Sequence, residues 1–172
     1  MSMSAAGPPQ GANCAPSGGS AAAPAASVGA PQAAEGRSSP VFRLPVRVYY
    51  EDTDAAGVVY YANYLRFMER ARTEWLSSLG FELAALEREH GVVFAVHHVD
   101  IRYHRPARLG DRLDVSAAMA GHGRARLFAL QEVTRGTDVL VDARVTLACL
   151  DRVSWRPARI PAPLAARMEI PA

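Results

Sequence analysis

The spacing of hydrophobic and polar residues changes along the chain, and each change marks an expected element. Residues 46–51 alternate between apolar and polar side chains, as in a half-buried strand. Further on, apolar residues recur every three or four positions and predict a helix over about 61–79. Gly80 follows this helix, and glycine is typical of a helix C-terminus. The connection 52–60 is acidic and contains a glycine.

After residue 91 the hydrophobic period shortens from about 3.6 to about 2, which predicts strands. The first such strand is expected over 92–104. Simple alternation puts one set of its residues on a shared face: Val93, Ala95, His97, Val99, Ile101 and Tyr103. Three more strands are expected over 112–120, 124–134 and 139–150, and turns containing glycine separate them.

One long helix and five strands, joined mainly by hairpins, predict an α+β domain over residues 41–155. The helix is expected to cover one face of a mostly antiparallel sheet. In a monomer the other face and the strand edges would stay exposed, so we expect a homodimer, paired by strand addition at an edge.

The two ends of the chain differ from this domain in composition. Residues 1–40 consist mostly of Ala, Gly, Ser and Pro. Such a segment buries too little apolar surface to offset its conformational entropy, so we predict that it is disordered. Residues 156–172 are rich in proline and are expected to form a C-terminal tail on the surface.

Charge and cysteine usage narrow the classes of function. The chain has 19 Lys+Arg against 17 Asp+Glu, so its overall charge gives no reason to expect a nucleic-acid partner. All of the basic residues are arginines, which leaves Arg, backbone N–H groups and helix ends to contact any phosphate. Cys14 and Cys149 lie far apart, which favours reduced thiols and a cytoplasmic location. No run of about 18 apolar residues occurs, so no transmembrane segment is expected.

The acidic connection carries the candidate chemistry. Asp52 and Asp54 precede the predicted helix, and at a helix start the N–H groups are unpaired and the dipole is positive. A carboxylate beside free N–H donors suits a reaction at a carbonyl group. Asp54 is equally compatible with a helix N-cap or an Asx turn, and the pattern alone leaves these alternatives open.

Other site types fit the sequence poorly. Asp52, Asp54 and Gly57 match three positions of an EF-hand loop, but Asn63 stands where the bidentate Glu is needed, so no metal ion is expected. The histidines lack the spacing of a zinc site. Neither G-x-S-x-G nor G-x-G-x-x-G occurs, which argues against a serine hydrolase and a dinucleotide-dependent enzyme.

Three segments carry a resemblance to a known family. They are YYEDTDAAGVVYYANY (49–64), ERARTE (69–74) and YHRPARLGD (103–111). Together they resemble the hotdog-fold acyl-CoA thioesterases of the 4-hydroxybenzoyl-CoA thioesterase type, and more narrowly the Tol-Pal-associated bacterial branch. The resemblance covers nearly all of 44–155 and implies a long central helix wrapped by a five-stranded sheet. It also implies active sites at the interface of a homodimer, which can pair further into a homotetramer.

The same resemblance implies roles for single residues. The catalytic aspartate of the family falls on Asp54, and a position that is His or Tyr in the family falls on Tyr61. The implied oxyanion donor is a backbone N–H at the helix start, at about Tyr61. Substrate-binding residues are expected at Gly57, Val58, Val59, Tyr60 and Asn63. The sequence departs from the pattern at Ala56, where many members have Gly and where a positive φ would strain Ala.

The expected reaction is hydrolysis of an acyl-CoA thioester to the free acid and CoA, and acyl carrier protein is a candidate partner. It needs no metal or organic cofactor, because a thiolate is already a good leaving group. Asp54 is expected to act as nucleophile or as general base. Glu69, on the helix, is expected to make a salt bridge or a hydrogen bond. The alternative function is a module that binds acyl-CoA or acyl carrier protein without hydrolysis, since a fold does not fix a function.

Overall fold

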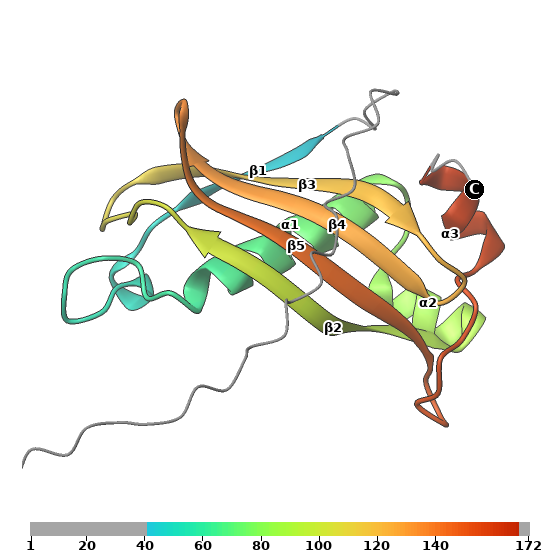
Figure 1. The fold of residues 1–172 in the computed structure, drawn as a ribbon. Helices are drawn as coiled ribbons and strands as arrows, with labels where there is room; N and C mark the ends of the chain where they lie inside the picture. Colours follow the sequence, from blue (N-terminus) through green and yellow to red (C-terminus); the bar gives the residue numbers. More distant parts are fainter. Residues whose placement is uncertain (1–40, 169–172) are drawn as a thin grey trace, which may run out of the picture. The chain divides into compact units, whose positions relative to one another are not determined.

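A five-stranded antiparallel sheet wraps around one long helix (Figure 1). The computed structural model describes residues 41–168, so the predicted disorder of 1–40 lies outside the described part. The strands follow the order β1-β3-β4-β5-β2 across the sheet. Their bounds are β1 Phe42–Arg47, β2 Val92–Tyr103, β3 Arg112–His122, β4 Arg126–Arg135 and β5 Asp138–Asp151. The helices are α1 Asn63–Ser78, α2 Leu83–His90 and α3 Ala162–Arg167. The predicted two-layer α+β architecture is confirmed.

Helix α1 packs on one face of the sheet, mainly against β1, β3 and β4. Its buried face carries Tyr64, Phe67, Met68 and Ala71, the positions that the helical period predicted. These side chains share one core cluster with the inward-facing residues of β3, β4 and β5. Because α1 lies toward the β1 side of the sheet, it leaves part of the inner face of β5 and β2 uncovered.

The predicted strand over 46–51 is wrong in its bounds. Strand β1 ends at Arg47, and Tyr50–Asp52 form a single turn of 3₁₀-helix. The Asp52 carboxylate explains the break, because it accepts a hydrogen bond from the Tyr49 N–H at 2.8 Å and so holds the backbone in a turn. At its N-terminal end, β1 begins at Phe42, before the predicted start. It therefore includes Pro45, which an edge strand tolerates.

Strand β2 contains a bulge that the simple alternation did not predict. Val96 pairs with Leu147 and His98 with Thr146, so His97 is an extra residue in the ladder. The extra residue reverses the alternation, because successive strand residues point to opposite faces. Val96 therefore shares the inner face with Val99, and the predicted grouping of Val93 and Ala95 with Val99 is wrong.

The segment after β5 packs more closely than the predicted surface tail. Its backbone joins the sheet region through the Ile160 N–H, which donates to the Arg124 carbonyl at 3.0 Å. Ile160, Leu164 and Met168 are buried in a second hydrophobic cluster, which they share with apolar residues of α1, α2 and β4. The three residues are four apart, with Leu164 in α3 and the other two on either side of this helix, a pattern that the neighbouring prolines obscured. No helix within residues 41–168 is both long and apolar enough to span a bilayer.

Candidate active site

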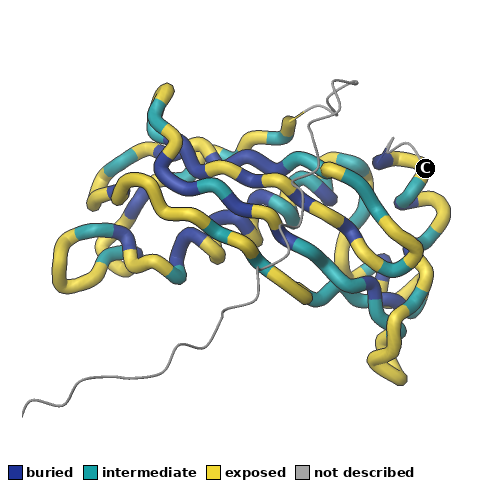
Figure 2. Tube along the Cα trace, in the orientation of Figure 1, coloured by how far each residue is buried: buried dark blue, intermediate teal, exposed yellow. Residues whose placement is uncertain are grey.

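The acidic connection folds into a small loop immediately before α1. The Asp54 N–H donates to the Val58 carbonyl, and the Tyr60 N–H donates to the Asp52 carbonyl, each at 2.9 Å. These two bonds close the base of the loop, where residues 53 and 59 form an antiparallel bridge. Gly57 turns the loop with a φ of 72°, a left-handed conformation that glycine adopts without steric cost. Most of the loop is exposed (Figure 2).

Asp54 is exposed at the start of this loop. Its Oδ1 accepts a hydrogen bond from the Ala56 N–H at 2.9 Å, which is the Asx turn considered from the sequence. The other oxygen, Oδ2, has no hydrogen-bond partner within residues 41–168 and stays open to solvent or substrate. Ala56 is unstrained, because Trp155 is the one residue other than glycine with a positive φ in the described part of the chain.

Several hydrogen bonds fix the loop to α1 and to the segment before β3. Asn63 is buried, and its side-chain amide donates to the Asp52 carbonyl at 2.9 Å. Asp52 is buried as well, with its carboxylate bound to the backbone. Val59 packs in the core, and its N–H donates to the Ala107 carbonyl at 2.9 Å. Asn63 and Val59 thus have structural partners, and their roles in substrate binding stay predictions.

The start of α1 offers free backbone donors. Helix α1 begins two residues later than predicted, and the N-cap residue Ala62 supplies no capping side chain. The Asn63 N–H donates to the Tyr60 carbonyl at 2.8 Å. The N–H groups of Tyr61 and Ala62 have no acceptor within residues 41–168. Unpaired N–H groups at the positive end of a helix dipole can stabilise a developing oxyanion.

Four tyrosines gather at this end of α1. The rings of Tyr60 and Tyr61 lie 4.6 Å apart, and Tyr103 of β2 lies 6.5 Å from Tyr61 and 5.8 Å from Tyr64. The Tyr103 hydroxyl donates to the Tyr61 carbonyl at 3.2 Å, so β2 helps to position the residue that precedes the N-cap. Tyr103 was not predicted as a site residue. Its position at the end of the apolar face of β2 is the sequence feature that could have predicted this role.

Three of these tyrosines, Tyr60, Tyr64 and Tyr103, remain neutral hydrogen-bonding groups at physiological pH. The pKa of Tyr60 is raised, first by the neighbouring Tyr61 phenol and to a smaller extent by burial and by the Asp54 carboxylate. Burial raises the pKa of Tyr64 and of Tyr103.

Two charged residues near the site, Glu69 and Arg108, have defined neighbours. The Glu69 carboxylate accepts a hydrogen bond from the Thr73 hydroxyl at 2.9 Å, as a helix-surface residue rather than a buried one. Arg108 lies beside the acidic loop, because residues 58 and 108 form an antiparallel bridge. Arg105 instead pairs with Asp138 at 2.9 Å.

Comparison with known proteins identifies the family. The family described as the thioesterase-like superfamily matches residues 48–168. The chain belongs to this family. The match includes the acidic loop and all of α1, and it extends past residue 155 through α3. Family membership confirms the predicted resemblance to thioesterases.

Thioesterase-like relatives cover most of the chain. "Acyl-CoA thioester hydrolase YbgC" of Escherichia coli O6:H1 is 39% identical over 133 residues, 77% of this chain and 98% of the relative. "Acyl-CoA thioesterase YbgC" of Haemophilus influenzae is 43% identical over 120 residues, 70% of this chain and 88% of the relative. The crystal structure of a probable thioesterase from Bartonella henselae has a TM-score of 0.68 at 35% identity, covering 71% of this chain and 100% of the other. These matches confirm the predicted hotdog fold and the predicted enzyme class, a thiolester hydrolase.

Proposed function

We propose that this chain hydrolyses an acyl-CoA thioester to the free acid and CoA, with Asp54 as the reacting carboxylate. The observation that carries the proposal is an exposed carboxylate, with one oxygen free, on a braced loop before the unpaired N–H groups of Tyr61 and Ala62. The relatives named as acyl-CoA thioester hydrolases support the choice of substrate. Gly57, Val58 and Tyr60 would contact the substrate from the exposed side of the loop.

Two reaction routes use the same arrangement. In the first, an Asp54 oxygen attacks the thioester carbonyl, the C–S bond breaks to release the CoA thiolate, and water then hydrolyses the acyl-enzyme anhydride. In the second, Asp54 removes a proton from water, the resulting hydroxide attacks the carbonyl, and the C–S bond breaks to give the acid and the CoA thiolate. Both routes pass through an oxyanion, which the Tyr61 and Ala62 N–H groups would stabilise. One such donor is typically worth about 3 kcal/mol.

Residues around the loop would bind and orient the thioester. Tyr61 is 61% exposed, so its ring is free to contact the acyl group or the attacking water. Arg108, beside the loop, would meet a phosphate of CoA, because guanidinium groups pair with phosphate oxygens through two N–H donors. No step needs a metal ion or an organic cofactor. The same thioester chemistry would apply to an acyl carrier protein substrate, and the proposed location is the cytoplasm.

The sheet edges favour a homodimer paired through β2. Strand β1, at one edge, is short and contains Pro45, which removes a backbone donor. Strand β2, at the other edge, has 12 residues, and Val96 on its inner face is 53% exposed. Strand addition at β2 would join the two sheets edge to edge and place the uncovered inner faces of both copies next to each other. A dimer of dimers would need a second surface, such as the outer sheet face with Phe128 and Leu130.

A solution mass would test the dimer. We expect light scattering to give twice the 18.5 kDa of one chain. Val99→Pro in the middle of β2 should shift this mass toward that of one chain, because the Val99 N–H faces the open edge and proline removes it. Arg43→Pro, which removes a donor from the open edge of β1 instead, serves as the matched control and should leave the mass unchanged. A wild-type protein with the mass of one chain at micromolar concentration would contradict the dimer.

The thioesterase proposal predicts release of free thiol from acyl-CoA. Acyl-CoA substrates that span short aliphatic, long aliphatic and aromatic acyl groups would be incubated with the full chain, and thiol release would be followed with a chromogenic disulfide. We expect turnover of at least one substrate well above the rate without enzyme. Binding of these acyl-CoA compounds without thiol release from any of them would instead support the non-hydrolytic binding module.

A further inference from the structure

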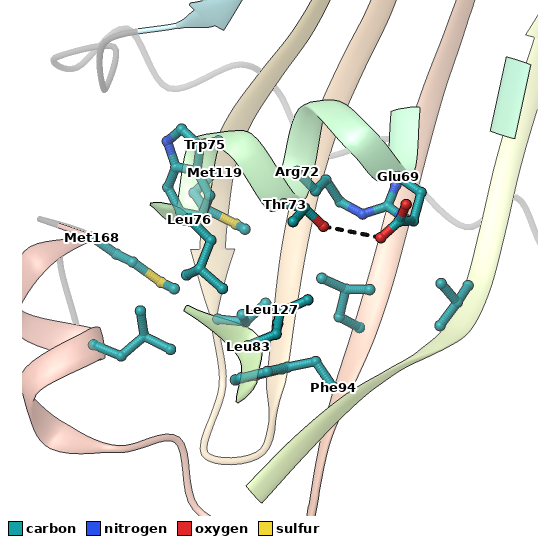
Figure 3. Close-up of a pocket in the computed structure, with 13 residues that line it drawn as sticks. Glu69, Arg72, Thr73, Trp75, Leu76, Leu83, Phe94, Met119, Leu127 and Met168 are labelled. Carbon is teal, nitrogen blue, oxygen red and sulfur yellow. Dashed lines mark hydrogen bonds between the residues drawn. The ribbon is translucent and has the colours of Figure 1, made fainter. Parts of the chain in front are cut away.

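A cavity of about 110 Å³ lies between the C-terminal half of α1 and the sheet, away from the acidic loop. Its walls come from α1, α2, α3 and four strands (Figure 3). Most of the lining side chains are apolar, among them Trp75, Leu76, Phe94, Met119, Leu127 and Met168. The cavity is partly open, so its apolar lining is in contact with water. Burying such a lining against a hydrocarbon group is favourable, so this cavity suits a hydrocarbon group.

A groove lies beside this cavity, toward the start of α1. The groove runs between α1 and the inner face of β2 and β5, and its lining includes Leu65, Val99 and Val145. Glu69, Arg72 and Val96 line both the groove and the cavity. The two hollows are therefore neighbours. From the N-cap of α1 to the turn that borders the cavity, the path is about 20 Å long, at about 1.5 Å per helical residue.

The two polar residues that line both hollows have hydrogen-bond partners. The Arg72 guanidinium donates to the Gln131 Oε1 of β4 at 2.6 Å, and the Glu69 carboxylate accepts from the Thr73 hydroxyl at 2.9 Å. Burial lowers the pKa of Arg72, but an arginine stays charged at neutral pH. With the heads bound, the methylene stems of both side chains can line the path.

The C-terminal segment forms the far wall of the cavity. Leu164 of α3 and Met168 line it and are buried, and Figure 3 shows Met168 extending toward Leu76 and Leu83. Methionine side chains are unbranched and flexible, so Met119 and Met168 can adjust to the end of a hydrocarbon chain. A compact aromatic acyl group held at the thioester site would not reach this wall.

We propose that the cavity is the terminal pocket for the acyl group and that the preferred substrate is a thioester of a long, unbranched fatty acid. The proposal rests on the proposed thioesterase function. The thioester carbonyl would lie at the N–H groups of Tyr61 and Ala62, the middle of the chain would follow the groove, and the methyl end would enter the cavity. Each buried methylene group contributes about 0.8 kcal/mol, so chains that reach the cavity gain the most.

Chain-length selectivity tests this directly. The kcat/KM values would be measured for acetyl-, benzoyl-, octanoyl- and palmitoyl-CoA by thiol release, with palmitoyl-CoA kept below its micelle concentration. We expect palmitoyl-CoA to exceed acetyl- and benzoyl-CoA by at least about tenfold, a ratio within reach of hydrophobic pockets. Hydrolysis of acetyl- or benzoyl-CoA with no gain for palmitoyl-CoA would overturn this inference alone. No hydrolysis of any thioester would overturn the proposed function itself.

Cavity-filling variants assign the selectivity to this pocket. Leu83 borders the cavity from α2 and is 42% exposed, so Leu83→Trp should fold. Leu127→Phe fills the interior, with thermal unfolding as the check of its fold. Each folded variant should lower the ratio of kcat/KM for palmitoyl-CoA to that for acetyl-CoA by at least tenfold. Phe128→Trp is the matched control, because Phe128 lies on the outer face of β4, beside Leu127. It should leave the ratio of kcat/KM for palmitoyl-CoA to that for acetyl-CoA unchanged. An unchanged ratio in Leu83→Trp would refute the pocket.

Discussion

Asp54→Asn is expected to lower the kcat of thioester hydrolysis by about 10²–10⁴-fold, the range typical of a general acid–base group. Asparagine can neither attack the carbonyl nor remove a proton from water. Its side-chain oxygen can still accept the Ala56 N–H, so the Asx turn and the loop should remain intact. The measurement is kcat by thiol release on the best acyl-CoA substrate, together with the thermal unfolding midpoint, which should not change.

A matched variant separates this effect from a general loss of charge. Glu51 is another exposed acid in the same segment, and its carboxylate makes no hydrogen bond within residues 41–168. Glu51→Gln should therefore keep kcat within about twofold of the wild-type value. If Asp54→Asn retained full activity while remaining folded, the assignment of Asp54 would have to be abandoned.

Gln131→Leu is expected to lower the free energy of unfolding by about 3 kcal/mol, because buried polar groups left unpaired cost about 1–3 kcal/mol each. Gln131 is buried in β4, where its Oε1 accepts from Arg72 at 2.6 Å. Its Nε2 donates to the carbonyls of Met68 and Ser116 at 2.9 and 3.1 Å. Leucine keeps the volume of the side chain but removes all three bonds, and it leaves a largely buried guanidinium without its acceptor.

Urea unfolding of the two proteins would measure this difference. The neighbouring residue Leu130 points to the outer face and is 43% exposed, so Leu130→Ala should cost less than about 1 kcal/mol and serves as the control. Gln131→Glu restores an acceptor for Arg72 without restoring the amide donor, and its stability should lie between those of the wild type and Gln131→Leu. Equal stability of Gln131→Leu and the wild type would show that the network adds nothing.

The sequence predicted those parts of the fold in which a local period repeats. The helical spacing of Phe67, Met68 and Ala71 and the alternation in β3, β4 and β5 each give a face that one element buries. The errors lie where a single interaction overrides the period. The Asp52 carboxylate ends the first strand early, and one inserted residue, His97, reverses the faces of β2. Both depend on three-dimensional context that a periodic pattern does not contain.

The candidate site likewise has parts that local sequence patterns predict and parts that they do not. The acidic loop and Asp54 were predicted, since the residues that form the turn are close together in the chain. The contact of Tyr103 with Tyr61 joins residues 42 positions apart, and the bond from Arg72 to Gln131 joins residues 59 apart. The cavity needs the C-terminal segment to return to α1. Such long-range contacts follow from the packing of the whole domain, and local sequence patterns carry little information about them.

Pro45 has a consequence for assembly beyond its effect on β1. A sheet with two open edges can add copies at both ends and grow into a fibre. In the sheet formed by residues 41–168, proline interrupts the row of donors along β1, whereas β2 contains no proline. Pairing of two copies through β2 would consume both permissive edges and leave a β1 at each end. Polymerisation would then stop at a closed, finite particle, and the same residue that an edge strand tolerates would keep the protein from aggregating.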